Sequence, residues 1–349
     1  MTSSPPVGFG LIGTGMIAEY HARAIAETKG GVLVGVAGRS EAKTRAFAAK
    51  AGIGFWTTSI EALVARPDIA VICIATPSGA HLEPALAAVR AGKHLVVEKP
   101  LEITVERVDA LLAAAAAAGV LVAAIFQSRF GPGARTVKAA LDAGRFGRLV
   151  LASAYVKWHR TAEYYRDSWH GTQALDGGGA LMNQGIHAVD LLQWFAGMPA
   201  EVFGWTTRRV HTGIEAEDTA AAALRFPGGA LGAVEASTAL YPGWARRLEI
   251  CGDLGSAALE DDRIAKWDFR TPHPQDEAIR NAVPDESMRS GSGAPNQISH
   301  QGHRLQIQDL IDALRGHRSP AIDGRDARNA VALIRAIYAS AKSGRPVAL

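Results

Sequence analysis

Cysteine, clustered charge and long apolar runs are all scarce in this 349-residue sequence, and each scarcity excludes a class of protein. The only two cysteines, Cys73 and Cys251, lack metal-type spacing, so we expect no zinc site or other metal site and two buried free thiols. Lys and Arg are scattered and the formal net charge is +3, which argues against a nucleic-acid surface.

Neither a membrane span nor an export signal is expected. The Ala-rich apolar run over residues 111–126 is interrupted by Gly119 and is too short to cross a bilayer. Residues 1–6 have neither the basic region nor the apolar stretch of a signal peptide. With 48% hydrophobic and 20% charged residues, the composition is that of a globular protein, for which we expect a cytoplasmic location.

A glycine-rich turn stands near the start of the chain. The apolar run 7–12 leads directly into Gly13, Thr14, Gly15, Met16, Ile17 and Ala18, and a helical pattern follows. In a dinucleotide-binding turn the first glycine permits the turn, the second lets a pyrophosphate approach, and a small third residue lets helix pack on strand. We therefore predict that residues 13–17 bind a dinucleotide at a helix N-terminus. A plain βα turn, with glycines used for packing only, is the alternative.

The periodicity of the chain changes near Gln127. Before it, short apolar strands alternate with helices, which predicts a parallel, doubly wound sheet and an NAD(P)-binding Rossmann domain over residues 1–127. After it, strands follow one another with one helix among them, a loop over residues 271–299 and two closing helices. This predicts an α+β domain, residues 128–349, for substrate binding and oligomerisation, with a large, open, mainly antiparallel sheet. The uncovered face of such a sheet favours a homodimer or homotetramer.

The segment after the second strand bears on the choice of cofactor. NAD-binding enzymes place a carboxylate there to bind the ribose 2′-OH, but this chain has Gly38, Arg39 and Ser40. The missing acid removes repulsion with a 2′-phosphate, and the Arg39 guanidinium can pair with that phosphate. NADP is therefore favoured over NAD. Arg39 as a solvated turn residue is the alternative.

Polar residues follow the later strands of the first domain, where an open α/β sheet binds its ligands. Thr76, Pro77 and His81 follow one strand; His81 either lies near the nicotinamide ribose or only caps a helix. Glu98 and Lys99 follow the next strand, before Pro100, and the peptide bond between the last two is a candidate for cis. Lys99 is predicted to bind a substrate hydroxyl, the alternative being a surface salt bridge. Gln127 completes the predicted cofactor contacts.

In the second domain the turn Asp176-Gly177-Gly178-Gly179 opens a helix that carries Asn183 and His187. Residues four apart share one face of an α-helix, so the pair could supply an amide donor and a proton acceptor. A histidine on a helix is otherwise more often a core or surface residue.

An aromatic and basic stretch lies just past the first strand of this domain. Aromatic faces stack on sugar rings, and arginine binds hydroxyl, carboxylate or phosphate oxygens. Substrate contact is predicted for Trp158, Arg160, Tyr164 and Trp169, with Arg129 and His303 as further candidates. The same stretch could instead fill a subunit interface.

These motifs together resemble the Gfo/Idh/MocA family (glucose–fructose oxidoreductase, inositol dehydrogenase and rhizopine catabolism proteins). The resemblance rests on residues 13–18, 76–77, 91–94 leading to 98–100, the glycines 178–179 followed by His187, and residues 323–324 and 337–341 near the end. It implies NAD(P)-dependent oxidation or reduction of a secondary alcohol on a sugar or polyol. The family's lysine falls on Lys99 and its histidine on His187. The chain departs from the family at Asn183, where an aspartate is frequent, and at Gly38.

Three functions are compared on this basis. The first is a sugar or polyol dehydrogenase in which His187 is the base and Lys99 the electrostatic partner, since an imidazole pKa near 6.5 suits proton transfer at neutral pH better than an ammonium near 10.4. The second is a glycosidase that acts through transient oxidation by a bound nicotinamide. The third, a non-catalytic dinucleotide-sensing protein, is disfavoured by the presence of both residues.

Overall fold

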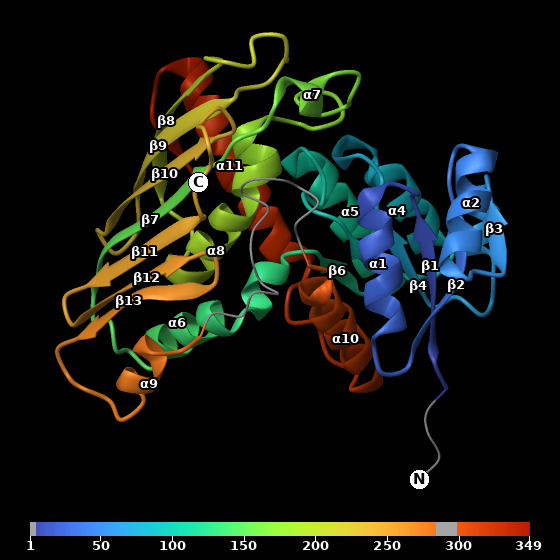
Figure 1. The fold of residues 1–349 in the computed structure, drawn as a ribbon, viewed down its shortest axis with the longest axis horizontal. Helices are drawn as coiled ribbons and strands as arrows, with labels where there is room; N and C mark the ends of the chain where they lie inside the picture. Colours follow the sequence, from blue (N-terminus) through green and yellow to red (C-terminus); the bar gives the residue numbers. More distant parts are fainter. Residues whose placement is uncertain (1–4, 284–298) are drawn as a thin grey trace. The chain divides into compact units, whose positions relative to one another are not determined.

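A computed structural model describes residues 5–283 and 299–349, so residues 1–4 of the N-terminal segment and 284–298 of the predicted loop lie outside it (Figure 1). The chain divides into two compact units. The first comprises residues 1–127 and 300–328, and the second comprises residues 128–299 and 329–349. Residues 300–328 thus belong with the Rossmann part of the chain and not with the second domain to which the sequence prediction assigned them.

The first unit is built on a six-stranded, entirely parallel sheet with the order β3-β2-β1-β4-β5-β6. This is the strand order of a dinucleotide-binding doubly wound fold. Its strands are β1 (Val7–Ile12), β2 (Gly31–Ala37), β3 (Phe55–Thr57), β4 (Val71–Ile74), β5 (His94–Val97) and β6 (Val122–Ala124). Its helices include α1 (Met16–Ala26), α2 (Glu41–Ala51), α3 (Ile60–Val64), η1 (Ser78–Ala80), α4 (Leu82–Arg90), α5 (Val105–Ala118) and α10 (Gln301–Arg315). The sequence analysis did not predict β3.

The strand register brings the carboxyl ends of this sheet to one edge. Ile12 pairs with Ala37 on one side and with Ile74 on the other, and Ile74 pairs with Val97. The residues that follow these four strands therefore leave the sheet at the same level. They are the glycine turn after β1, Gly38 after β2, the Thr76 segment after β4 and Glu98 after β5.

Helix α10 completes the core of the first unit. Ile307, Leu310 and Ile311 have no exposed surface and pack in one cluster with Phe9 of β1 and Ile25 of α1. Helices α1 and α10 lie side by side (Figure 1). The apolar face of α10 predicts burial, but nothing in its periodicity says which sheet it covers, and this explains the wrong assignment.

The second unit contains an eight-stranded mixed sheet with the order β13-β12-β11-β7-β10-β9-β8-β14. All of its neighbouring strands are antiparallel except β7 and β10, which run parallel. The strands are β7 (Leu149–Lys157), β8 (Glu201–Thr207), β9 (Thr219–Arg225), β10 (Leu231–Ser237), β11 (Arg247–Gly252), β12 (Gly255–Glu260), β13 (Arg263–Phe269) and β14 (Val347–Ala348). The sequence analysis did not predict β13 or β14.

Helices pack against one face of this sheet. Helix α8 (Ile186–Ala196) contacts β7 and β11, while Ile337 of α11 (Gly324–Ser343) packs near Gly204 of β8. The other helices of the unit are α6 (Pro132–Asp142), α7 (Ala162–Tyr165), η3 (Ala180–Gly185) and α9 (Asp276–Arg280), and η2 (Gln127–Phe130) lies where the units divide. Alternate residues of β9 are buried and exposed, as expected for a sheet with one open face.

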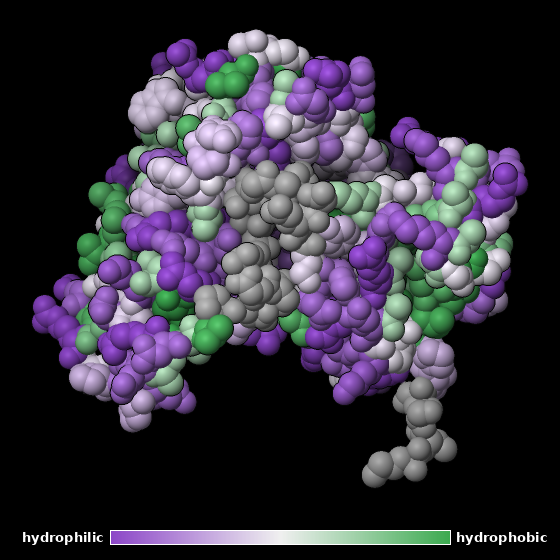
Figure 2. All heavy atoms as spheres, in the orientation of Figure 1, coloured by the Kyte–Doolittle hydropathy of each residue, from purple (hydrophilic) through white to green (hydrophobic). Residues whose placement is uncertain are grey.

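Apolar side chains remain exposed along the second sheet and its connecting loops. Figure 2 shows hydrophobic residues at the left-hand edge, over these strands. Among the exposed side chains of these strands and loops are Val150, Leu231, Trp205 and Trp244, of which the last two are 62% and 65% exposed. An apolar surface of this kind is typical of a contact with another protein.

Neither cysteine forms a disulfide. Cys73 is buried in β4, and its burial raises the pKa of the thiol. Cys251 is only partly buried, which differs from the prediction of two buried thiols. No helix in the described part of the chain is both long enough and apolar enough to cross a membrane.

Candidate active site

The turn after β1 has the backbone that a pyrophosphate requires. Gly13 has φ +117°, and a Cβ there would lie 2.4 Å from the carbonyl oxygen of Ala75, so only glycine fits. A Cβ at Gly15 would meet nothing within 4 Å, so the space beside this residue is open. Gly15 caps α1 without a side-chain hydrogen bond, while Ala18 is fully buried. Open space at a helix N-terminus that has no side-chain cap fits the phosphates of a dinucleotide.

Thr14, Met16 and Ile17 complete this turn. Met16 is 50% exposed, whereas Thr14 and Ile17 are partly buried. The predicted cofactor residues 13–17 thus lie together, at the carboxyl edge of the sheet and the start of α1.

At the end of β2, a side chain in place of Gly38 would displace its neighbours. A Cβ at Gly38 would lie 2.5 Å from Thr44 Oγ1 and 2.9 Å from Thr14 Cγ2. Ser40 caps α2, since its hydroxyl accepts a hydrogen bond from the Lys43 backbone N–H. Arg39 stands between these two residues with its side chain exposed. It is therefore the charged side chain of this three-residue segment.

His81 connects the segments that follow β4 and β5. Its ring nitrogens lie 2.9 Å from the Pro100 carbonyl oxygen and 3.0 Å from the Thr76 carbonyl oxygen. The side chain is 1% exposed, and burial lowers its pKa. His81 therefore lies between the two segments at the carboxyl edge of the sheet, beside the partly buried Pro77, and its neutral ring donates to one of the two carbonyl oxygens.

Glu98 is the centre of a buried polar cluster that the sequence analysis missed. Its Oε1 accepts hydrogen bonds of 2.9 Å from His21 Nε2 on α1 and from His303 Nε2 on α10. Burial alone would raise the pKa of Glu98, but the hydrogen bonds and charge interactions with the two histidines together outweigh it and hold the pKa well below its usual range. The carboxylate is thus ionised. His303, predicted to contact substrate, is 1% exposed in this cluster.

Three candidate ligand atoms within 4.8 Å of one another also make this cluster a possible metal site. A histidine that binds a metal through one ring nitrogen usually donates the other N–H to a further acceptor. Within the described residues, Nδ1 of both His21 and His303 lacks a hydrogen-bond partner. Both hydrogen bonds fit a ring tautomer that donates through Nε2, because Nδ1 then carries only a lone pair. The cluster is therefore better explained as a carboxylate held by hydrogen bonds.

Lys99 follows this anchored carboxylate directly. Its backbone N–H donates to Glu98 Oε2 at 3.2 Å, and its side chain is partly buried at the end of β5. The Lys99–Pro100 peptide bond is cis, as predicted. After the neighbouring strand β6, Gln127 has a buried Oε1 that no described residue hydrogen-bonds. Such an acceptor fits a ligand donor, in keeping with its predicted cofactor role.

In the second unit, the glycine turn is tied to the residues that follow it. Asp176 Oδ2 accepts from the Gly171 backbone N–H at 2.7 Å, and Asp176 Oδ1 accepts from Asn183 Nδ2 at 2.6 Å. Asn183 and His187 are both partly buried. Asn183 therefore has a fixed amide orientation, whatever further contact it makes.

The predicted continuous helix from residue 179 to 194 is wrong in its first turn. Residues Ala180–Gly185 form the π-helix η3, and only then does α8 begin. Asn183 lies in this π-helical turn and His187 is the second residue of α8, so the four-residue spacing between them crosses the boundary of the two helix types. Such turns are frequent at functional sites.

The aromatic and basic stretch packs as one group, part of it against η3. The Arg160 guanidinium lies 5.1 Å from the Trp158 ring centroid and 5.6 Å from that of Tyr164. Tyr164 also accepts a hydrogen bond of 3.2 Å from Gln184, the neighbour of Asn183. Trp158 and Arg160 are buried, and burial lowers the pKa of Arg160. The structure thus brings Trp158, Arg160 and Tyr164 close to η3.

Trp169 and Arg129 have other surroundings. Trp169 stacks on His170, which in turn lies 4.3 Å from the Tyr164 ring, so Trp169 extends the aromatic group. Arg129 is 4% exposed and forms a bidentate pair with Asp190 of α8, at 2.8 Å and 2.7 Å. This commits two of its guanidinium nitrogens to anchoring the helix of His187.

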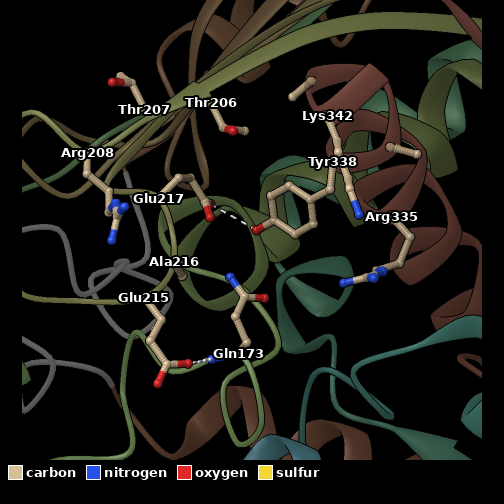
Figure 3. A pocket seen from close by; sticks show the side chains of 12 residues that line it. Gln173, Thr206, Thr207, Arg208, Glu215, Ala216, Glu217, Arg335, Tyr338 and Lys342 are labelled. Atoms are coloured by element: carbon tan, nitrogen blue, oxygen red, sulfur yellow. Dashed lines mark hydrogen bonds between the residues drawn. The ribbon is translucent and has the colours of Figure 1, made fainter. Parts of the chain in front are cut away.

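Next to η3, a surface hollow of about 600 Å³ is lined in part by Glu217, Tyr338, Arg335, Arg208, Glu215 and Lys342 (Figure 3). Glu217 precedes β9, and its carboxylate accepts from the backbone N–H groups of Gly179 and Leu181 and from the Tyr338 hydroxyl. Burial raises the pKa of Glu217 to about 7, although these donors act in the opposite direction. Sequence reasoning did not single out this residue.

Comparison with known proteins agrees with this arrangement. Residues 7–126 match the family model described as "Oxidoreductase family, NAD-binding Rossmann fold", and residues 134–258 match the GFO/IDH/MocA C-terminal domain. The WlbA dehydrogenase from Bordetella pertussis, solved in complex with NADH and UDP-GlcNAcA, is 33% identical with a TM-score of 0.87, over 99% of each chain. The chain belongs to the GFO/IDH/MocA family.

Curated relatives of this GFO/IDH/MocA protein carry several substrate names. A 1,5-anhydro-D-fructose reductase from Ensifer adhaerens is 32% identical over 53% of this chain and 55% of its own length. An inositol 2-dehydrogenase from Rhizobium meliloti is 26% identical over 98% of this chain and 99% of its own. The chain thus spans about half the length of the first relative and nearly all of the second.

Proposed function

We propose that this protein is an NAD(P)-dependent oxidoreductase that transfers a hydride between the nicotinamide and a secondary alcohol or ketone of a sugar, polyol or sugar derivative. The observation that carries the proposal is the position of Lys99. It follows the carboxyl end of β5, next to the anchored carboxylate of Glu98, in the same unit as the dinucleotide-binding turn. Family membership over nearly the whole chain supports the same chemistry.

Lys99 and His187 have different roles at the reacting hydroxyl. His187 takes the proton from the hydroxyl, and Lys99 holds the oxygen by a charge-assisted hydrogen bond. The nicotinamide supplies the hydride acceptor when it is bound. Asn183 orients the substrate and carries no proton, since its amide is already held by Asp176.

A hydroxylated substrate suits the polar groups near η3. Trp158 Nε1 is a buried donor and Gln184 Oε1 a buried acceptor, and neither has a hydrogen-bond partner within the described part of the chain. A sugar hydroxyl can both donate and accept, so it would satisfy either atom. The aromatic rings of Tyr164 and Trp169 suit the apolar face of a sugar ring.

NADP is the proposed preferred cofactor, because Gly38 cannot carry a carboxylate and Arg39 is exposed beside it. One charge-assisted contact with the 2′-phosphate is worth roughly 1.5–3 kcal/mol, or about tenfold to a hundredfold in affinity. NADPH and NADH are titrated against wild type, Arg39→Ala and the exposed control Arg45→Ala. Equal wild-type affinities, or equal losses in the two variants, exclude the preference.

The reaction is tested by the absorbance of the reduced nicotinamide. Inositols, aldoses, their keto forms and UDP-GlcNAcA are screened with NADP and NAD, and net reduction of added cofactor distinguishes a dehydrogenase from a glycosidase that retains its nicotinamide. With the substrate so identified, His187→Ala and Lys99→Ala should each lose roughly a hundredfold to ten-thousandfold in turnover and still bind cofactor. Near wild-type turnover in either variant refutes the role given to that residue.

The open sheet of the second unit is the proposed contact with a second copy, giving a homodimer or homotetramer. Exposed apolar residues on its strands and loops support a buried interface there. Symmetric contacts between identical faces are the commonest kind in oligomers.

A further inference from the structure

We propose that Glu217 is a positioning residue for His187: its carboxylate holds the glycine turn and the π-helical turn from which the helix of His187 begins. This inference rests on the proposed function, in which His187 is the base. Glu217 itself lies before β9 and is not part of the helix that it holds.

Three backbone contacts join Glu217 to the start of η3. Glu217 Oε2 accepts from the Gly179 N–H at 3.0 Å and Oε1 accepts from the Leu181 N–H at 2.9 Å. The Glu217 carbonyl oxygen also accepts from the Ala180 N–H at 3.0 Å. Three successive N–H groups at a helix start are thus satisfied by one residue. A negative charge at this end also interacts favourably with the helix dipole.

The fit around this contact is tight. A Cβ at Gly179 would lie 1.7 Å from the Glu217 carbonyl oxygen, and a Cβ at Gly178 would lie 2.3 Å from the Tyr338 hydroxyl. Glycine at both positions lets the turn approach Glu217 and α11 closely. The glycines of this motif therefore serve the contact with Glu217 in addition to shaping the turn.

On its other side the carboxylate meets α11. Tyr338 donates its hydroxyl to Glu217 Oε1 at 2.9 Å, the contact drawn in Figure 3. Glu217 is 8% exposed and is one of the residues that line the hollow described above. Every donor that reaches its two oxygens favours an ionised acceptor, because an amide or a protonated carboxyl would present a hydrogen of its own to one of them.

This contact depends on pH near neutrality. Burial raises the pKa of Glu217 to about 7, so its charge is lost as the solution becomes mildly acidic. Other ionisable groups face it from four segments: Tyr338, Arg335 and Lys342 of α11, Arg208 after β8, Tyr165 of α7, and Glu215 on its own segment. Protonation replaces one acceptor by a donor at the turn, which loosens the N-terminal end of the His187 helix.

Hydrogen exchange tests the contact without requiring a substrate. In wild type, the amides of Gly179 and Leu181, corrected for intrinsic rates, should be protected at pH 8 and lose protection as the pH falls through about 7. Glu217→Gln should lack this protection at both pH values, whereas the exposed matched control Glu215→Gln should behave as wild type. Tyr338→Phe keeps the carboxylate and removes a donor that lowers its pKa, so its transition should move to higher pH.

Kinetics with the identified substrate test the consequence. Glu217→Gln should lose about tenfold to a hundredfold in kcat, the scale of a small misplacement, while cofactor affinity stays unchanged. The acidic limb of the variant's pH–rate profile should also lack the ionisation of Glu217, so it should show one ionisation fewer than wild type. Wild-type protection in Glu217→Gln overturns the contact, and lost protection with unchanged kcat overturns positioning. If wild type turns over no substrate, the proposed function fails, while the exchange result still decides the contact.

Discussion

The buried carboxyl of Glu217 contributes stability that should be lost as the pH rises through about 7. Its pKa is about 7 in the folded chain against 4.5 for the ordinary side chain, because burial disfavours the charge. Between these values the folded chain retains a proton that the unfolded chain releases, so the stabilisation present below pH 4.5 is lost progressively up to about 7. The difference of the two values, at about 1.36 kcal/mol per pH unit, corresponds to about 3 kcal/mol.

Glu217→Gln isolates this contribution, since a glutamine cannot titrate. Urea unfolding of wild type and variant at several pH values from 4.5 to 8 gives the two free energies of unfolding. The variant's free energy of unfolding, relative to wild type, should rise by about 3 kcal/mol across this range. All other titrations are common to both proteins and cancel in the difference.

If the difference in free energy of unfolding between wild type and Glu217→Gln does not change with pH, the reasoning is refuted. Glu215→Gln controls for the removal of a carboxylate from the same hollow, because Glu215 is exposed. If the positioning role is also correct, activity rises with pH over the interval in which stability falls. A residue retained at a cost in stability is the pattern expected of function.

Three further outcomes are expected. Asp190→Asn leaves the buried Arg129 without its carboxylate and should lower the free energy of unfolding by about 3–5 kcal/mol, measured by urea titration; replacing both residues by apolar ones should cost less. Gly13→Ala should lower both the melting temperature and cofactor affinity, whereas Gly15→Ala, with open space beside it, should lower affinity alone; equal melting temperatures would contradict the steric argument. Light scattering at micromolar concentration should give a dimer or larger, and Trp205→Asp should shift it toward monomer; a wild-type monomer removes the proposed interface.

Local patterns predicted much of this molecule. Apolar runs bounded by glycine gave β1 and the turn through Gly15, because backbone conformation and steric room depend on few neighbouring residues. The alternation of strands and helices predicted the parallel sheet, because a helix between successive strands returns the chain to the same edge of the sheet. The peptide bond before Pro100 was a candidate for cis because a proline follows it, and it is cis in the structure.

Long-range contacts could not be predicted in this way. His21, Glu98 and His303 are separated by 77 and 205 positions, and only the packing of α1 and α10 brings them together. The contact of Glu217 with the turn at Gly179 spans 38 positions and depends on where β9 begins. Such clusters depend on tertiary packing, and a single sequence carries no periodic signal for them.

The π-helical turn and the short strand β3 escaped prediction for a different reason. Residues 180–185 have the composition of an ordinary helix, and the extra residue per turn is set by the contacts of the turn and not by propensity. Strand β3 has only three residues, too few for a period of two to be recognised. Residues 300–328 could not be assigned to a unit from the sequence, because the sequence does not show which apolar surface helix α10 packs against.

Because α10 supplies part of the first core, that unit is discontinuous in the sequence, and this constrains how the protein is made. On the ribosome, residues 1–127 emerge long before Ile307, Leu310 and Ile311, whose side chains fill the space beside Phe9 and Ile25. The first unit therefore remains incompletely packed while the intervening 172 residues, from 128 to 299, are synthesised. A fragment that ends at Gln127 would retain this exposed apolar surface permanently, so it should aggregate unless the helix is supplied in trans.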